Sequence, residues 1–269
     1  MKKKILKILA VIGGGLYIIC FAYGVKVISD NIISRAEVKD IATEYIKKNY
    51  KGKDYYVKYV DHYSLKQGMF GVDIESKSSK DSYFYLEINM DGKIRRDNYE
   101  DAVEKRQNVA CRLNEEYDAL IQKTLKNKKT SFKLDDVWGE LAWTSKELEK
   151  YGDIAETYGD VGDYIVADDL ELDKKYDVGK IGKEAGCISI WIIDRKVTVE
   201  KATKYMLEVK EILDEENVSF YKMDFHLWHG VDFSKKLLSK DIHIYNVLQE
   251  DIKEEGLEKY IRNNMVNGL

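Results

Sequence analysis

The fold is decided by the stretch "CISIWII" (Cys187–Ile193), an uninterrupted apolar run with the length of one strand. Such a run is typical of a strand that is covered on both faces. The next segment, "VTVEKATKYMLEVKEILDEEN" (Val197–Asn217), repeats apolar residues at helical spacing, and Thr198 can cap the helix. A second strand-like run, "VSFYKMDFHLW" (Val218–Trp228), follows. This order predicts a strand–helix–strand unit with a right-handed crossover.

Segments on both sides extend this unit into a domain, which we place at residues 129–269. Residues 132–143 read as extended, "DIHIYNVL" (Asp241–Leu248) has the pattern of another strand, and a final helix is expected around Leu257–Met265. An acidic segment punctuated by glycine, residues 145–175, is interpreted as a turn region. A calcium loop is the alternative, because its aspartates supply hard oxygen ligands. The domain is therefore expected to be of the α+β class.

A smaller α+β domain is predicted before it, over residues 31–128. Apolar residues recur at helical spacing from Ala36 to Ile46, and Ser34 is a suitable N-cap. Three strand-like runs follow: "YYVKYVDHYSL", "MFGVDIES" and "SYFYLEINMDGKIRR". Their alternation of apolar and polar residues predicts an antiparallel sheet. A long helix, residues 98–125, is expected to connect this domain to the next one.

The first domain resembles the PepSY or cystatin-like domains found beside bacterial membranes. The resemblance lies in a helix of the form A-x-x-x-x-I-A-x-x-Y and a last strand that ends in D-G-K-I. The residues that carry it are Ala36, Ile41, Ala42, Tyr45 and Asp91–Ile94. It implies a binding or inhibitory module rather than an enzyme.

The second domain resembles the C-terminal domain of the YfjL-like proteins. The residues that carry this resemblance are Leu172, Asp173, Tyr176, Asp177, Gly182 and Gly186, and the strand–helix–strand order follows them. YfjL-like proteins are membrane-anchored bacterial proteins with a short leader, a small α+β domain and a βαβ-containing end. The resemblance implies this architecture for nearly the whole chain, and it implies no particular activity.

The first 30 residues predict a cytoplasmic stub and a transmembrane anchor. No charged residue occurs between Ile8 and Val25, and a helix of that length spans about 27 Å, close to a hydrocarbon core of about 30 Å. Lysines precede the span, so the positive-inside rule places the N-terminus in the cytoplasm and the bulk of the chain outside a cell membrane crossed once. A cleaved signal peptide ending near Ala22–Gly24 is the alternative. A lipoprotein is disfavoured, because Ile19 precedes Cys20.

Composition and motifs argue against several classes of function. The formal net charge of −4 leaves no basic field for nucleic acid. "GKIGKEAG" (Gly179–Gly186) lacks the spacing and the hydroxyl group of a phosphate-binding loop, so no nucleotide is expected. The sequence has no G-x-S-x-G nucleophile elbow. Cys111 and Cys187 are expected to be small buried side chains, with a disulfide between them as the alternative. No cofactor is predicted.

The stretch "MDFHLWHGVDF" (Met223–Phe233) is the strongest candidate for chemistry. Strand alternation places Asp224 and His226 on one face, and a histidine–carboxylate set suits zinc or iron. Lys222 shares that face and repels a metal ion, so a packed structural role is favoured. The metal hypothesis needs a third ligand from His229, Asp232 or His243, and we take His229 as the first choice.

Two functions follow from these patterns. The first is an extracytoplasmic binding module that is anchored in the membrane and contacts an envelope protein, a peptide or a wall polymer. The second is a metal-dependent extracytoplasmic enzyme centred on Asp224, His226 and His229. The anchor and the missing catalytic motifs favour the binding module.

Overall fold

The computed structural model describes residues 33–64, 68–150, 163–229 and 241–267. It divides into two compact units, Met1–Val103 and Glu104–Leu269, which are described one at a time. The leader predicted for residues 1–30 lies outside the described residues. Within the described residues, no helix is both long enough and apolar enough to cross a membrane.

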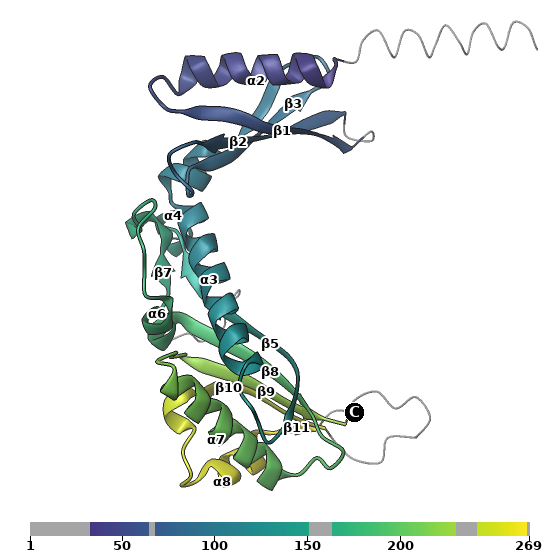
Figure 1. Ribbon diagram of the computed structural model, residues 1–269, viewed down its shortest axis with the longest axis vertical. Helices are drawn as coiled ribbons and strands as arrows, with labels where there is room; N and C mark the ends of the chain where they lie inside the picture. The colour runs from purple at the N-terminus through teal and green to yellow at the C-terminus, as the bar shows by residue number, and fades with distance from the viewer. Residues whose placement is uncertain (1–32, 65–67, 151–162, 230–240, 268–269) are drawn as a thin grey trace, which may run out of the picture. The chain divides into compact units, whose positions relative to one another are not determined.

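The first unit is a helix followed by a four-stranded antiparallel sheet (Figure 1). Its elements are α2 (Arg35–Asn49), β1 (Tyr55–Ser64), β2 (Met69–Ser76), β3 (Tyr83–Asn89) and β4 (Ile94–Asp97), with the strands in the order β1-β2-β3-β4. The third predicted run forms two strands, because it turns between Asn89 and Ile94, where Gly92 adopts a φ of +81°. The α+β prediction is confirmed for this unit.

Helix α2 begins where the sequence predicts. The Ser34 hydroxyl accepts a hydrogen bond from the backbone N–H of Glu37, and the Glu37 carboxylate accepts one from the backbone N–H of Ser34. One face of the helix buries Val38, Ala42 and Ile46. Alternate residues of the strands are buried with them, namely Val60, Phe70, Val72, Ile74, Phe84, Leu86 and Ile88. The predicted alternation of β3 is confirmed.

The long helix expected over residues 98–125 is interrupted. A π-helical turn, Glu100–Glu104, comes first, and Arg106 then adopts a left-handed φ of 59° before α3 (Gln107–Lys126) begins. Buried residues of α3 belong to the core of the second unit: Val109, Leu113, Tyr117, Ile121 and Leu125. The prediction that this helix belongs with the first domain is therefore wrong, because helical periodicity shows an apolar face without showing which core that face packs against.

The second unit contains a five-stranded mixed sheet in the order β11-β10-β9-β8-β5. Its strands are β5 (Lys133–Leu141), β8 (Gly186–Ile193), β9 (Lys222–Trp228), β10 (Ile242–Leu248) and β11 (Val266–Asn267). Strands β8 and β9 pair in parallel and are joined by α7 (Val199–Glu215), so the strand–helix–strand prediction is confirmed. The Thr198 hydroxyl caps α7 by accepting a hydrogen bond from the backbone N–H of Lys201.

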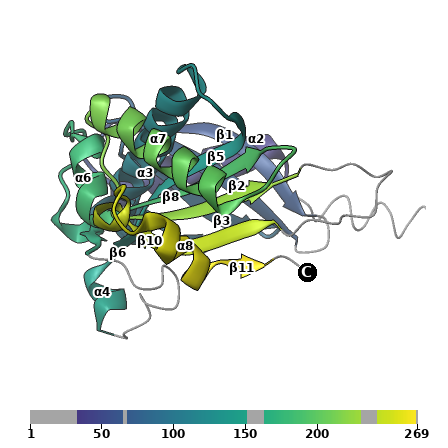
Figure 2. The same ribbon diagram turned by 90° about the horizontal axis from the view of Figure 1, so that it is seen from below.

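Shorter elements complete the second unit. They are β6 (Trp143–Thr144), α4 (Lys146–Glu149), β7 (Ile165–Val166), α6 (Val178–Ala185), α8 (Leu257–Asn264) and the 3₁₀ turns Ala167–Asp169 and Gln249–Asp251. Helix α7 lies beside both α3 and α8 (Figure 2). Helix α6 occupies the motif that the sequence analysis compared with a phosphate-binding loop.

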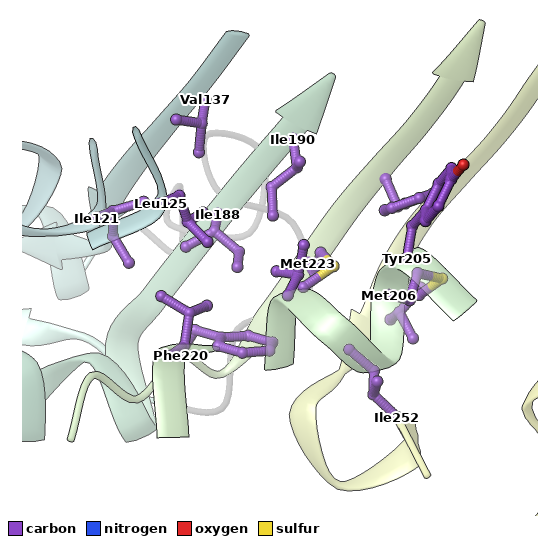
Figure 3. Packing of buried hydrophobic residues seen from close by; sticks show 14 of the residues in the cluster. Ile121, Leu125, Val137, Ile188, Ile190, Tyr205, Met206, Phe220, Met223 and Ile252 are labelled. Atoms are coloured by element: carbon purple, nitrogen blue, oxygen red, sulfur yellow. The ribbon is translucent and has the colours of Figure 1, made fainter. Parts of the chain in front are cut away.

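The core lies on one face of this sheet (Figure 3). Strand β9 contributes Met223, Phe225 and Leu227, each with no exposed surface. Strand β8 contributes alternate residues of the apolar run, Ile188, Ile190 and Ile192. Because only these alternate residues enter the helix-covered core, the opposite face of β8 carries a different set of side chains.

Helix α3 also covers the free edge of β5. The Asp118 carboxylate accepts a hydrogen bond from the backbone N–H of Gly139 at 2.8 Å, and the Asn114 amide oxygen accepts one from that of Leu141 at 2.7 Å. An exposed strand edge is a template for unwanted pairing, and these side chains satisfy two of its donors. Pairing of another strand along this part of β5 is therefore disfavoured.

Two glycines, Gly182 within α6 and Gly186 at its C-cap, permit close packing around Tyr117, which is fully buried. The Tyr117 hydroxyl donates a hydrogen bond to the backbone carbonyl of Ser219 at 2.9 Å. A Cβ atom on Gly182 would lie 2.2 Å from that carbonyl oxygen, and one on Gly186 would lie 2.5 Å from the Tyr117 hydroxyl. The glycines thus serve helix-to-core packing.

Candidate functional site

Two of the predicted metal residues, Asp224 and His226, lie within β9, and the third, His229, lies just beyond it. Asp224 and His226 lie on the same face of the strand, opposite Met223 and Phe225, so the alternation that the sequence predicts is confirmed. His229 follows the last residue of the strand. The geometry of these three residues decides whether they form one site.

Each of the three side chains has a different partner. The Asp224 carboxylate accepts a hydrogen bond from the backbone N–H of Asn246 at 2.8 Å. The Nδ1 atom of His226 lies 2.8 Å from Nδ1 of His243. The remaining residue, His229, places its Nδ1 atom 2.8 Å from the carboxylate of Asp241.

The structure does not bring Asp224, His226 and His229 together as a set of metal ligands. Within the described ranges, no group of three or more His, Cys, Asp or Glu side chains is placed to hold a metal ion. The register between β9 and β10 shifts between Ile244 and Val247. Asp224 accepts its hydrogen bond from Asn246, which lies within this shift. Asp232, which was considered as a third ligand, lies outside the described residues.

His226 instead belongs to a row of rings that crosses four strands on the face opposite the core. We call this set the aromatic row: Trp138 of β5, Trp191 of β8, His226 of β9, and His243 and Tyr245 of β10. Trp191 pairs with His226 in the parallel ladder, and His226 pairs with His243 in the antiparallel one. Strand register therefore aligns residues that are distant in the sequence.

The rings of the aromatic row contact one another. Trp191 stacks on His226 with centroids 4.0 Å apart and an angle of 18° between the planes. Trp138 stacks on Trp191 at 6.5 Å and 28°, and Tyr245 meets His226 edge-on at 5.3 Å. Such pairs contribute about 0.5–1.5 kcal/mol each beyond the area that they bury. The row is therefore a preassembled surface.

The row is open at both ends and closed at its centre. Trp138 is 42% exposed and Tyr245 is 48% exposed, whereas His226 is only 3% exposed.

The indole N–H groups of Trp191 and Trp228 are buried and have no hydrogen-bond acceptor in the part of the chain that the structure describes. Trp228 lies edge-on to Trp191, with centroids 6.4 Å apart. A buried donor without a partner costs about 1–3 kcal/mol.

Burial sets the charge of the central histidine. Burial, together with the smaller effect of the neighbouring His243, lowers the pKa of His226 to about 4. His226 is therefore neutral at neutral pH. One proton lies between the two Nδ1 atoms, so one ring donates it and the other ring accepts it.

The other end of this face holds Cys187, Glu140 and Lys222. Burial raises the pKa of the Cys187 thiol to about 11, so the thiol is protonated at neutral pH and is a weak nucleophile. Burial also raises the pKa of Glu140. The Lys222 ammonium donates a hydrogen bond to the side-chain oxygen of Asn246 at 2.9 Å. Cys111 and Cys187 are both free thiols, and Cys111 is exposed rather than buried as predicted.

The acidic segment that was compared with a calcium loop is only partly described. Its Asp168 carboxylate accepts a hydrogen bond from the backbone N–H of Lys146 at 2.9 Å, and Asp169 forms an ion pair with the ammonium of the same lysine. These two carboxylates thus hold α4 in place. Residues 151–162 lie outside the described residues.

The sequence indicates His226 and, as a possible third ligand beside it, His243, which the structure places next to each other. It does not indicate Trp138, Trp191 or Tyr245. The apolar run "CISIWII" was interpreted as a strand covered on both faces, whereas Trp191 and Cys187 are only partly buried. Alternation within the run was the available signal, because Cys187, Ser189 and Trp191 share one face. Trp138 joins the row through the register between β5 and β8, which the sequence does not show.

Comparison with known proteins gives one match. A family model described as YfjL-like C-terminal domain matches residues 116–262, more than half of the chain. The matched span begins within α3 and ends within α8, so it includes the whole aromatic row. Neither the curated proteins nor the solved structures contain a match.

Proposed function

The chain belongs to the YfjL-like C-terminal domain family, and from this premise we propose that it is a single-pass membrane protein of the bacterial cell envelope. The N-terminus lies in the cytoplasm, a helix within residues 1–30 anchors the chain, and both units are extracytoplasmic. The support is the uncharged stretch of residues 8–25 with lysines before it.

The second unit is the binding module in this proposal, and the aromatic row is its contact surface. The single observation that carries the assignment is a connected set of rings whose outer members, Trp138 and Tyr245, are 42% and 48% exposed. Exposed aromatic side chains are enriched at protein interfaces, and large ones are frequent hot spots. Rings held by their neighbours lose little conformational entropy on binding.

The geometry of the row favours a protein surface over a wall polysaccharide. A sugar ring stacks on the flat face of an aromatic side chain. Trp191 lies between Trp138 and His226 in strand order and stacks on both, so its two faces are already covered. The exposed area of the row lies on Trp138 of β5 and Tyr245 of β10, two strands that are not neighbours in the sheet, and two separated rings suit a protein surface.

The first unit is assigned a PepSY-like binding or inhibitory role. Support comes from the residues that carry this resemblance and from the order of one helix followed by an antiparallel sheet. No reaction is assigned to either unit, since the Cys187 thiol is protonated and the residues of the metal hypothesis have separate partners.

Site-specific photo-cross-linking in living cells tests the binding surface. A benzophenone side chain at position 138 or 245 is expected to trap the same partner protein. The matched control is position 148, since Leu148 is also a large exposed apolar residue of this unit, at 44%. The proposal that the aromatic row is the interface would be refuted if all three positions cross-linked the partner equally. It would also be refuted if positions 138 and 245 cross-linked no protein.

Protease accessibility tests the membrane orientation separately. An epitope at the C-terminus is expected to be digested when protease is added to intact protoplasts. The chain without residues 1–30 is expected to leave the membrane fraction. An epitope that survives until the membrane is broken would refute the extracytoplasmic placement.

A further inference from the structure

The free edge of β1 in the first unit lies beside a hollow of about 270 Å³. Strand β1 is the terminal strand of its sheet, so among the described strands it pairs on one side only, with β2. The hollow is lined by Arg35, Ala36 and Lys39 of α2 and by residues 57–60 of β1. Four consecutive strand residues and none of β2 line it, which places the hollow along the unpaired backbone.

We propose that this edge binds an extended acidic segment of a partner protein, which pairs with β1 as an additional strand. This inference concerns the first unit and does not depend on the role proposed for the aromatic row. An unpaired strand edge offers backbone N–H and C=O groups at the spacing that another strand matches. Addition of a strand to such an edge is a recurring mode of peptide recognition.

The hollow is large enough for one amino-acid side chain and too small for a typical small organic ligand. Sites for small organic ligands have volumes of roughly 300–1,000 Å³, and this hollow has about 270 Å³ and is open to solvent. Its apolar lining comes from Ala36, Val57 and Val60. One apolar side chain of the added strand fits against these residues.

Charge complementarity identifies the remaining side chains of the segment. Arg35 and Lys39 are exposed on the first two turns of α2, and neither has an ion-pair partner among the described residues. They are four residues apart, so both side chains lie on the same side of the helix. In an extended strand, residues at i and i+2 point to the same side. A segment of the form acidic–x–apolar–x–acidic therefore places carboxylates on both sides of the apolar residue.

Lys58 of β1 does not block the free edge of this strand. Lysine at an edge strand often prevents pairing with other chains. Here the Lys58 ammonium lies 2.5 Å from the Glu75 carboxylate of β2, so it is directed over the sheet and away from the free edge. Between the register shifts at Val57/Tyr59 and His62/Ser64, the residues from Tyr59 to His62 form a regular stretch that is available for pairing.

The same charges disfavour two other occupants. Self-association through two β1 edges would bring two copies of Arg35 and Lys39 together, and like charges repel. An anionic lipid headgroup would match the cations but would leave the backbone groups of β1 unused. A peptide satisfies the cations and the backbone together, so it is the occupant that we infer.

A labelled synthetic peptide tests the proposal on the full chain in detergent. The probe is Ser-Glu-Thr-Val-Thr-Glu-Ser, and its binding is followed by fluorescence anisotropy. Saturable binding is expected, and the variant Arg35→Glu/Lys39→Glu is expected to weaken it about tenfold or more. The matched control is Lys47→Glu/Lys48→Glu, which makes the same charge change in the last turn of α2. It is expected to bind within about twofold of the parent.

A second probe separates backbone pairing from charge alone. The same peptide with alternate backbone amides methylated keeps every side chain and cannot pair with a strand. Its binding is expected to be lost, and the unmethylated peptide is expected to slow amide hydrogen exchange in residues 57–61. Equal binding of the methylated and unmethylated peptides would overturn the strand-addition proposal in favour of a simple anion site. So would displacement of the peptide by nanodiscs that contain phosphatidylglycerol. Absence of saturable binding, or equal weakening in the control variant, would also overturn it.

Discussion

Substitution of Gly182 by alanine tests the packing that holds the second unit together. An added Cβ atom would lie 2.2 Å from the carbonyl oxygen of Ser219 and 2.6 Å from Cε2 of Tyr117. Both distances are far below van der Waals contact, and the oxygen belongs to the backbone, so α6 must move away from the core. Overpacking of this kind costs typically 1–3 kcal/mol and more where backbone must shift. Alanine recovers up to about 1 kcal/mol of helix propensity.

The expected net loss of stability is about 2 kcal/mol, which is an overpacking cost of about 3 kcal/mol less about 1 kcal/mol of helix propensity. All four tryptophans, Trp138, Trp143, Trp191 and Trp228, lie in the second unit, so intrinsic fluorescence during urea denaturation reports on that unit alone. With a denaturant slope of about 2 kcal/mol per molar, the midpoint falls by about 1 M. The control is Lys183→Ala on the exposed face of the same helix. An unchanged midpoint for Gly182→Ala would show that α6 does not approach Tyr117 as closely as described here.

Three further outcomes follow from individual contacts. Tyr117→Phe leaves the partly buried Ser219 carbonyl without its 2.9 Å donor, so the urea midpoint should fall by an amount equivalent to about 0.5–1.5 kcal/mol. Thr198→Ala removes the α7 cap and should cost about 1 kcal/mol in the same assay, whereas Thr203→Ala on that helix serves as the comparison. The pKa of His226 is lowered to about 4, below its ordinary value near 6.5, so the unfolded chain binds a proton that the folded chain excludes. Stability relative to His226→Phe should be greatest above about pH 6.5 and should decline by at most about 3 kcal/mol as the pH falls to 4; a constant difference between the two chains would contradict the burial of this imidazole.

The strand–helix–strand unit could be predicted because its information is local. The apolar run of β8, the amphipathic α7 and the alternation of β9 each appear within one segment, and the Thr198 cap marks the start of the helix. The division of the chain could not be predicted in the same way. Helix α3 has an apolar face whose partner is chosen by tertiary packing, and it packs in the second unit.

The glycines in and next to α6 illustrate a second limit. In the sequence, Gly179, Gly182 and Gly186 suggest only a comparison with the spacing of a phosphate-binding loop. In the structure, Gly182 and Gly186 both lie against a tyrosine about 65 residues earlier in the chain, and Gly182 also lies against the carbonyl of Ser219. Absence of a Cβ atom is meaningful only once the neighbouring atom is known, and no local pattern shows that neighbour.

The candidate site shows how register decides what a residue can do. The sequence correctly places Asp224 and His226 on one face, and from that fact a shared metal ion was a reasonable hypothesis. The shift between Ile244 and Val247 directs Asp224 to the backbone of Asn246, while the regular part of the same pairing sets His226 opposite His243. One strand irregularity thus separates two neighbours that alternation had grouped. What remains at His226 is a neutral imidazole that stacks on Trp191 and shares a proton with His243.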